Sequence, residues 1–344
     1  MSGWPFEPPV APMEARVQTA LPPEGGWAYE PKWDGFRALA WGGADPRLDS
    51  RKQRPLLRYF PELAPALAQL PAGMVVDGEV VVVIDGELAF DALQQRIHPA
   101  DSRIQRLARK TPAQLVAFDL LARDGRDLRG EPFERRRREL TEAHADLAPP
   151  WHLTPSTTDR ATAERWFDAF EAAGCDGIVA KGLDGRYESG QRAMSKVKHR
   201  RTVDCVIGGY RLHKDGDRVG SLLLGLFDDG QLHFIGHCSG FKDAERVRLL
   251  DQLRPLEESS GAGGFGSRVR RPGEPSRWTG DKDLSWVGIR PELVCEVSYD
   301  QLTGDRFRHA TRFERWRPDK DPGDCTLEQL QRPEGPAFED VVVS

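Results

Sequence analysis

Residues 30–37 read Glu-Pro-Lys-Trp-Asp-Gly-Phe-Arg and follow the apolar run Trp27-Ala28-Tyr29. The apolar run predicts a strand, and Asp34-Gly35 predicts a tight turn. Lys32 lies between the two, with a carboxylate two residues away on each side, at Glu30 and at Asp34. An amine attacks only when it is deprotonated, so a site that uses Lys32 must lower its pKa by burial or with nearby cations. Solvated hairpins contain the same residue types, so this stretch alone leaves a catalytic and a structural interpretation open.

Length and composition indicate a globular protein with two domains. The chain has 344 residues and a formal net charge of −5, and its length allows a substantial core in each domain. No apolar run approaches the roughly 20 residues of a membrane span. The first nine residues lack a basic region followed by an apolar one, so we expect no secretory signal and a cytoplasmic location. Basic stretches at residues 96–110 and 192–201 predict local positive charge within an acidic chain.

The cysteines give no sign of a metal or disulfide framework. There are five of them, far apart and without a Cys-x-x-Cys pair: Cys175, Cys205, Cys238, Cys295 and Cys325. This spacing gives no support for a structural zinc site or for disulfide bonds.

Two core strands are predicted to carry carboxylates. Residues 74–84 contain more apolar residues than one face of a strand requires, so we expect a central strand covered on both sides. Asp77 and Glu79 interrupt it, and a carboxylate there needs a cation, a hydroxyl or an arginine. Residues 114–121 predict a second such strand with Phe118-Asp119 inside it. A phenylalanine at this place stacks on a base in some sites and packs in the core in others.

Charged residues also mark the end of the first domain. Residues 175–181 read Cys-Asp-Gly-Ile-Val-Ala-Lys, a predicted strand with Asp176 at its start and Lys181 at its end. Lys196 and Lys198 lie two residues apart in another predicted strand, so both point to one face.

Three further segments are assigned from their patterns. Arg51 lies in the polar stretch 50–54, before a predicted helix over 56–67, where it either binds phosphate at a helix start or belongs to a solvated loop. Residues 134–139 read Glu-Arg-Arg-Arg-Arg-Glu and are predicted to be the solvated face of a helix without chemistry. Residues 158–173 predict another helix.

The pattern changes at Thr202. Short strands are predicted at 203–210, 221–227, 232–235 and 293–297, with one helix at 244–256. This combination is typical of a small Greek-key barrel of the OB type, a common platform for nucleic acid. The proline-rich residues 1–26 are either an extended arm over the first domain or a disordered tail.

Seven motifs occur in one order, which is far more specific than any single match. They are Lys32, Arg51, Asp77-Gly78-Glu79, Phe118-Asp119, the stretch 176–181, Lys196-x-Lys198 and Arg317-x-Asp319-Lys320. Over residues 12–325 the chain resembles the ATP-dependent DNA ligases, and most of all the bacterial ligase C type and the ligase domain of ligase D.

The resemblance implies an α+β fold. A nucleotidyltransferase (adenylation) domain with antiparallel sheets and flanking helices would occupy residues 1–201, including the N-terminal arm. An all-β OB-fold domain would follow over 202–323, and an acidic, loosely ordered tail would occupy 324–344. Closure of the OB domain would hinge near Thr202.

The resemblance also implies a reaction. Lys32 would attack the α-phosphate of ATP, expel pyrophosphate and carry AMP as a phosphoramidate. AMP would pass to a 5′-phosphate at a nick or break in duplex DNA, and the 3′-hydroxyl would then displace it. Glu30 would help select adenine, Phe118 and Val179 would sandwich the base, and Asp34 would lie near the DNA junction.

Charged residues would serve the phosphates and a metal. Arg37 and Glu79 would hold ribose or phosphate, and Glu79 and Asp176 would lie near Mg²⁺ or Mn²⁺. Phosphate charge would be neutralised by Arg51, Lys181, Lys196 and Lys198, whose field would also depress the pKa of Lys32. Arg317 and Lys320 would reach the β- and γ-phosphates only on domain closure. Asp176 departs from the family pattern, which usually has a glutamate there, one methylene longer.

Three other interpretations remain, of which two also use a lysine that carries a nucleotide. The nearest are an RNA ligase and a GTP-using capping enzyme, and a more distant one is a nucleic-acid-binding relative without catalysis. The Arg-x-Asp-Lys ending argues against the first two, and the intact set of charged residues argues against the third. We expect a monomer that binds duplex DNA and no membrane, with DNA-repair proteins as further partners.

Overall fold

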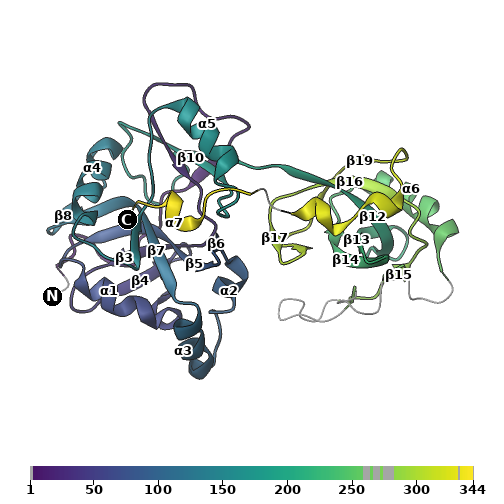
Figure 1. The fold of residues 1–344 in the computed structure, drawn as a ribbon, viewed down its shortest axis with the longest axis horizontal. Helices are drawn as coiled ribbons and strands as arrows, with labels where there is room; N and C mark the ends of the chain where they lie inside the picture. The colour runs from purple at the N-terminus through teal and green to yellow at the C-terminus, as the bar shows by residue number, and fades with distance from the viewer. Residues whose placement is uncertain (1–2, 259–263, 266–271, 274–282, 332–333, 344) are drawn as a thin grey trace. The chain divides into compact units, whose positions relative to one another are not determined.

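The computed structural model describes residues 3–258, 264–265, 272–273, 283–331 and 334–343. The chain forms two compact units, residues 1–199 with 332–344, and residues 200–331 (Figure 1). The boundary lies two residues before the predicted one. The predicted tail over 324–344 is instead divided, because residues up to 331 group with the second unit and the last residues pack on the first.

The larger sheet of the first unit has the predicted central strand in its middle. Its order is β4-β3-β5-β7-β8, with β6 paired to β5 and β9 paired to β7. The strands are β3 (Phe36–Trp41), β4 (Arg47–Ser50), β5 (Val75–Ile84), β6 (Glu87–Leu88), β7 (Ala113–Arg123), β8 (Arg126–Asp127) and β9 (Trp151–Leu153). Most of β5 is buried, as expected for an apolar strand that is covered on both faces.

A second sheet of four strands holds most of the charged motifs. Its order is β1-β11-β10-β2, comprising β1 (Ala15–Val17), β2 (Trp27–Pro31), β10 (Gly177–Gly182) and β11 (Met194–Lys198). The N-terminal arm is ordered, because β1 pairs in parallel with β11 and Val10 and Met13 are buried. The alternative of a disordered N-terminal tail is therefore wrong for these residues.

Helices cover the sheets of the first unit. They are η1 (Leu57–Tyr59), η2 (Pro61–Leu63), α1 (Ala64–Gln69), α2 (Phe90–Gln94), α3 (Asp101–Lys110), α4 (Phe133–His144), α5 (Arg160–Ala169) and α7 (Phe338–Val341). The single helix predicted over 56–67 is broken into η1, η2 and α1. Pro61 and Pro65 explain the break, because proline lacks the N–H that a continuous helix needs.

Helix α4 corrects the prediction for residues 134–139. It packs against β7 and β9, and the side chain of Arg136 is only 1% exposed. This segment therefore has a buried cation on its inner face, in addition to its solvated face.

The second unit is a barrel with one core. Its main sheet has the order β14-β13-β12-β16-β19, and a bridge between Cys238 and Thr311 brings the two edges together. The elements are β12 (Arg201–Leu212), β13 (Val219–Asp228), β14 (Gln231–Cys238), α6 (Asp243–Leu253), η3 (Arg254–Leu256), β15 (Val287–Gly288), β16 (Val294–Tyr299), β17 (Leu302–Thr303), β18 (Arg306–Phe307), β19 (Arg312–Trp316), η4 (Pro322–Asp324) and η5 (Leu327–Leu330). This closed arrangement agrees with the predicted OB fold.

Two general features complete the fold. Among the described residues, no helix is both long and apolar enough to cross a membrane. All five cysteines are buried with free thiols.

Candidate active site

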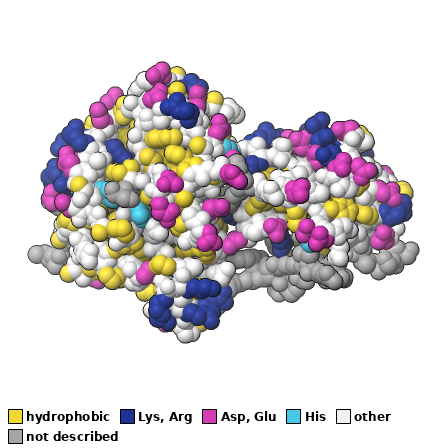
Figure 2. Space-filling model, viewed as in Figure 1, with side chains coloured by type: hydrophobic (Ala, Val, Ile, Leu, Met, Phe, Trp, Pro, Cys, Tyr) yellow, Lys and Arg dark blue, Asp and Glu magenta, His cyan; other side chains and the backbone are white. Residues whose placement is uncertain are grey.

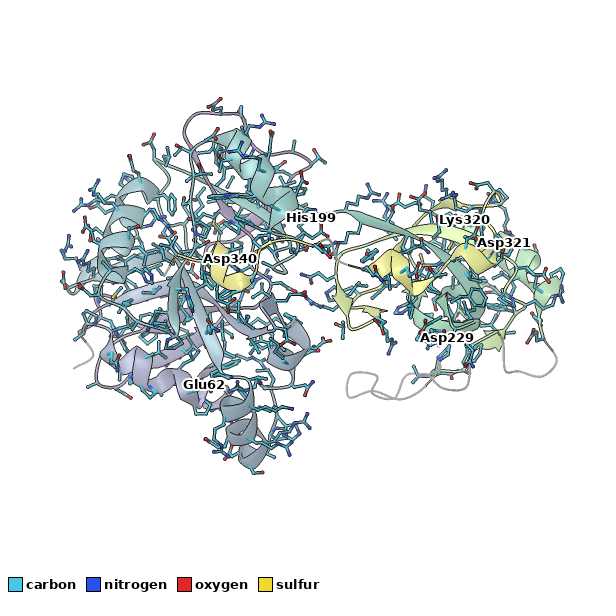
Figure 3. All side chains as sticks on the ribbon, viewed as in Figure 1. Glu62, His199, Asp229, Lys320, Asp321 and Asp340 are labelled. Carbon is cyan, nitrogen blue, oxygen red and sulfur yellow. The ribbon has the colours of Figure 1, made fainter. Side chains whose placement is uncertain are left out.

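A cavity of about 850 Å³ in the first unit gathers most of the predicted site residues. Those that line it are Glu30, Lys32, Asp34, Arg37, Arg51, Glu79, Phe118, Val179, Lys181, Lys196 and Lys198. Asp176 is buried beside Lys32. Arg317 and Lys320 belong to the second unit, where Figure 3 labels Lys320.

Backbone hydrogen bonds fix Lys32 next to Asp176. The N–H of Lys32 donates to the carbonyl of Gly177 at 2.9 Å, and the N–H of Asp176 donates to the carbonyl of Lys32 at 2.8 Å. Gly177 has a φ of 130°, a conformation that favours glycine. These bonds extend the antiparallel pairing of β2 with β10 and bring together residues that are far apart in sequence.

One carboxylate oxygen pairs with two lysines. Oδ2 of Asp176 lies 3.0 Å from Nζ of Lys32 and 3.0 Å from Nζ of Lys198. The side chain of Asp176 is 2% exposed, and those of the two lysines are 19% and 25% exposed. The arrangement is a compact ion triplet at the wall of the cavity.

The charges around Lys32 favour its protonated form. Burial alone would lower the pKa of Lys32, but the nearby carboxylates of Asp176, Glu79 and Asp34 outweigh it, and the pKa is raised. The expectation that neighbouring positive charges depress this pKa is therefore wrong. Burial and repulsion by Lys32 and Lys198 do lower the pKa of Lys196. The attraction between Lys32 and these carboxylates must therefore weaken before the amine can lose its proton and attack.

Two carboxyl groups have the chemistry of a divalent-cation site. Burial raises the pKa of Glu79 to about 8, despite the opposing charges of Lys32 and Arg37. Burial also opposes ionisation of Asp176, but Lys32 and Lys198 hold its pKa below the usual value. Its Oδ1 atom is buried without a hydrogen-bond partner among the described residues. Nowhere in the described part of the chain do three potential metal-ligating side chains gather. Two carboxylates suit Mg²⁺ or Mn²⁺ that takes its other ligands from phosphates and water.

The far end of the cavity is built around Glu30. Its Oε2 atom lies 2.8 Å from Nζ of Lys181, which also donates to the carbonyl of Phe118 at 2.6 Å. Nη1 of Arg137 is 3.7 Å from the Oε1 atom of Glu30. Lys181 is 3% exposed, so this geometry favours a role in holding Glu30 over the predicted role in neutralising phosphate. Phe118 and Val179 are half-buried and face the same cavity.

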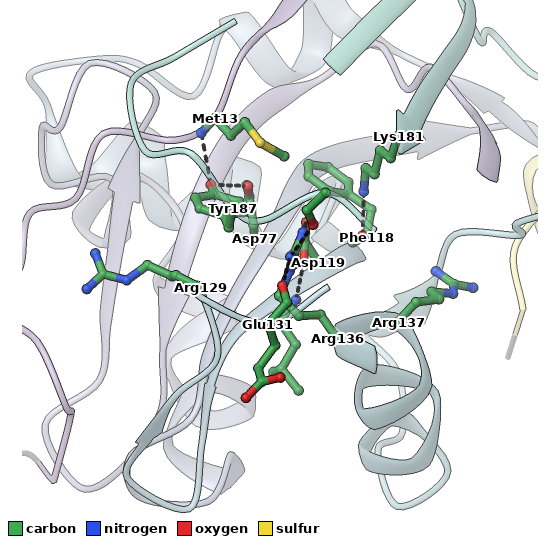
Figure 4. A network of polar contacts seen from close by, with 12 residues as sticks. Met13, Asp77, Phe118, Asp119, Arg129, Glu131, Arg136, Arg137, Lys181 and Tyr187 are labelled. Atoms are coloured by element: carbon green, nitrogen blue, oxygen red, sulfur yellow. Dashed lines mark hydrogen bonds and ion pairs between the residues drawn. The ribbon is translucent and has the colours of Figure 1, made fainter. Parts of the chain in front are cut away.

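A buried network of polar contacts that includes Asp77 and Tyr187 supports this end of the cavity (Figure 4). Arg37 donates to both carboxylate oxygens of Asp77, at 3.0 and 2.6 Å, and its guanidinium lies 5.2 Å from the ring centroid of Phe118. The hydroxyl of Tyr187 donates to Oδ2 of Asp77 at 2.6 Å. Arg37 therefore has a structural partner as well as a place in the cavity wall.

Asp119 is the second carboxylate of the network, and the sequence interpretation missed its partner Arg136. Arg136 donates to both oxygens of Asp119, at 2.8 and 3.1 Å, and both side chains are 1% exposed. A signal was present, because Phe133, Arg136 and Leu140 recur at helical spacing and all three are buried. Nothing local indicated Tyr187.

The C-terminal segment packs against residues next to Lys32 and Asp176 in the chain. Trp33 is 5% exposed, and its ring meets that of Phe338 edge-on, with centroids 5.6 Å apart. The same hydrophobic cluster contains Cys175, the neighbour of Asp176. Figure 3 labels Asp340, which follows in α7. This segment was predicted to be loosely ordered, but it packs on the chain neighbours of both members of the ion pair.

Two predicted phosphate-binding residues, Arg51 and Arg317, pair with carboxylates of the protein. Arg51 has a 62% exposed side chain and lies 2.8 Å from Glu14 of the N-terminal arm. In the second unit, Nη1 of Arg317 donates to both oxygens of Asp204 at 2.8 Å, and its other nitrogens contact Asp319.

Comparisons with known proteins agree over both units. The family model described as ATP dependent DNA ligase domain matches residues 8–198, and the one described as ATP dependent DNA ligase C terminal region matches residues 215–320. The chain is 50% identical to DNA ligase C of Mycobacterium tuberculosis over 98% of each chain. It is 35% identical to the multifunctional non-homologous end joining DNA repair protein LigD of that organism, over 88% of this chain and 37% of that protein.

A solved structure supports the fold. A Lig E DNA ligase superposes with a TM-score of 0.56 at 17% identity, covering 89% of this chain and 99% of that one. At this level of identity, the likeness concerns the fold alone.

Proposed function

The chain belongs to the ATP-dependent DNA ligase family, and on this premise we propose that Lys32 carries AMP from ATP to the 5′-phosphate of nicked or broken duplex DNA. The observation that carries this proposal is the position of the amine. Nζ of Lys32 lies at the wall of a cavity of about 850 Å³, 3.0 Å from Asp176, with Lys196 and Lys198 beside it.

In the first step the neutral amine of Lys32 attacks the α-phosphorus of ATP. A nitrogen–phosphorus bond forms, the bond to the bridging oxygen breaks, and pyrophosphate leaves with the electron pair. The ammonium proton must leave first. Weakening the pull of Asp176 would favour this, because burial of Lys32 then favours the neutral amine, as does its repulsion with Lys196.

The end of the cavity around Glu30 suits adenine. Oε1 of Glu30 is buried without a hydrogen-bond partner among the described residues, so it is available to accept a hydrogen bond from the exocyclic amine of the base. Lys181 and Arg137 hold this carboxylate in place. Phe118 and Val179 would provide apolar contacts to the two faces of the ring.

Positive charge on the cavity wall suits the phosphates. Arg51, Lys196 and Lys198 would neutralise charge that develops as pyrophosphate departs. Glu79 and Asp176 would hold Mg²⁺ or Mn²⁺, which supplies further charge neutralisation at the phosphates. Arg317 and Lys320 of the second unit would contact the β- and γ-phosphates when the two units close.

The later steps transfer AMP to DNA. The 5′-phosphate at the nick attacks the adenylate phosphorus and releases the amine of Lys32. The 3′-hydroxyl then attacks the 5′-phosphate, and AMP leaves. Asp34 lines the cavity two residues after Lys32, a position suited to the DNA junction. We also propose that the protein acts as a monomer and that DNA-repair proteins are among its partners.

Formation of the protein–AMP adduct tests the proposal. The purified chain is incubated separately with labelled ATP and labelled GTP, and the adduct is located by mass spectrometry. We expect an AMP adduct on Lys32 that Lys32→Ala abolishes. Lys52 is a matched control, because it lines the same cavity and Lys52→Ala should retain the adduct. An adduct that survives Lys32→Ala, or a preference for GMP, would overturn the proposal.

A further inference from the structure

We propose that helix α3 binds the phosphate backbone of the duplex DNA that flanks the nick. The α3 basic surface consists of Arg103, Arg106, Arg109 and Lys110 of this helix, with Arg58 of η1 beside it. This inference rests on the proposed function, since it assigns a part of the surface to the same DNA substrate.

The charge of α3 is opposite to that of the whole chain. Residues 101–110 contain four basic side chains and one carboxylate, a balance of +3, whereas the chain carries −5. Arg106, Arg109 and Lys110 are exposed. Figure 2 shows Lys and Arg side chains gathered over α3 on the first unit. Such a basic patch on an acidic protein is typical of a surface that binds a polyanion.

Apart from Arg58, which pairs with Asp101, the cations of this surface form no ion pair with a carboxylate of the described residues. Within the described residues, Arg106, Arg109 and Lys110 form no ion pair, and the carboxylate of Asp101 is taken up by Arg58 at 3.1 Å. Helix α5 differs, because Arg160 there pairs with Glu164 one turn away at 2.9 Å. The α3 basic surface therefore keeps its charge available for an external partner.

The helix is rigidly attached, so it presents this charge in a fixed direction. Ile104 and Ala108 of α3 are buried and form its inner face. Arg96, before the helix, is fully buried; it pairs with Glu62 at 2.7 Å and donates to the carbonyl of Thr111, after the helix, at 3.3 Å. Figure 3 places Glu62 beside α3. A rigid support limits the entropy lost when the surface binds a ligand.

Residues close in sequence to the α3 basic surface line the cavity that holds Lys32. Tyr59 follows Arg58, Ile97 precedes α3, and both line that cavity together with Lys52 and Arg54. Ten helical residues extend about 15 Å, and each strand of a duplex carries one phosphate per roughly 3.4 Å of its axis. Cations along such a helix contact phosphates whatever the sequence, which suits an enzyme that joins any sequence.

Neutralising the exposed cations tests the proposal. The variant carries Arg106→Gln, Arg109→Gln and Lys110→Gln, and its affinity for nicked duplex DNA is measured by fluorescence anisotropy from 50 to 200 mM salt. Three lost phosphate contacts reduce the slope of log affinity against log salt by about 2.7, so the parent loses roughly 40-fold more affinity across this range. At 50 mM salt we expect the variant to bind about 10- to 100-fold more weakly.

A matched variant and a second assay make the result specific. Arg138→Gln, Arg160→Gln and Arg165→Gln remove the same charge from α4 and α5 and should leave the salt slope close to that of the parent. AMP-adduct formation should persist in the α3 variant, which separates failure of this inference from failure of the proposed function. Equal salt slopes for the parent and the α3 variant would overturn the inference, as would equal losses in both variants. If the triple change unfolds the protein in a thermal melt, Arg109→Gln alone must still reduce the slope by about 1.

Discussion

The ion pair between Lys32 and Asp176 predicts that Asp176→Asn makes the amine more reactive at a given pH. Two unit charges 3.0 Å apart interact by about 5 kcal/mol at an effective dielectric constant near 20. Burial and the shared contact with Lys198 offset part of this, and we expect about 1.4 to 2.8 kcal/mol to remain, within the range that one nearby opposite charge contributes to a titrating group. Each 1.4 kcal/mol is a factor of ten. The neutral fraction of the amine should therefore rise about 10- to 100-fold below its pKa.

The assay must separate this effect from metal binding, because Asp176 is also proposed to hold a cation. The protein without ATP and metal is treated with a small amine-reactive reagent from pH 6 to 10, and modification of Lys32 is followed by mass spectrometry. Removing the carboxylate lowers the pKa of Lys32, so the reactivity profile of Asp176→Asn should move to lower pH.

Two variants serve as controls. Lys198→Met removes a neighbouring cation and leaves Asp176 to Lys32 alone, so the profile should move to higher pH. Asp34→Asn should have a smaller effect than Asp176→Asn, because Asp34 contributes the least of the three carboxylates that raise the pKa of Lys32. An unchanged or less reactive Lys32 in Asp176→Asn would refute the reasoning.

Three further predictions concern the surroundings of the site. Phe338→Ala removes a fully buried ring beneath Trp33 and should cost about 3 to 5 kcal/mol in urea denaturation, with slower AMP-adduct formation; unchanged stability would show that the C-terminal packing is unimportant. Arg136→Met leaves the buried Asp119 without its cation and should cost a similar roughly 3 to 5 kcal/mol, whereas a loss under about 1 kcal/mol would contradict the pairing. Burial raises the pKa of Glu79 to about 8, from an ordinary value of 4.5, so the folded state holds a proton that the unfolded state releases. The free energy of unfolding of the parent should therefore fall as pH rises between these values. Urea unfolding without metal at pH 4 to 9 should show no such fall for Glu79→Gln. Equal pH slopes for the parent and the variant would exclude the raised pKa of Glu79.

The sequence by itself determined the central strand of the first unit and the types of charged residue near the ends of several strands. The apolar excess of residues 74–84 required a central strand, and the alternation of Lys196 and Lys198 placed both on one face of a strand. These features follow from periodicity and burial, which are local properties. The order of seven motifs then identified the family, although no single motif did.

Only the tertiary structure decided which charges neutralise one another. The register of β2 with β10 places Glu30 opposite Val179, and Lys181 reaches Glu30 instead of lying open to phosphate. Packing between distant segments likewise pairs Asp119 with Arg136 and brings the ring of Phe338 against Trp33. Coulombic energy depends on the distance between charges, and those distances are set by strand register and packing between segments far apart in the chain. For this reason the sequence could single out Lys32 as the proposed nucleophile, but the direction in which its pKa shifts followed only from the fold.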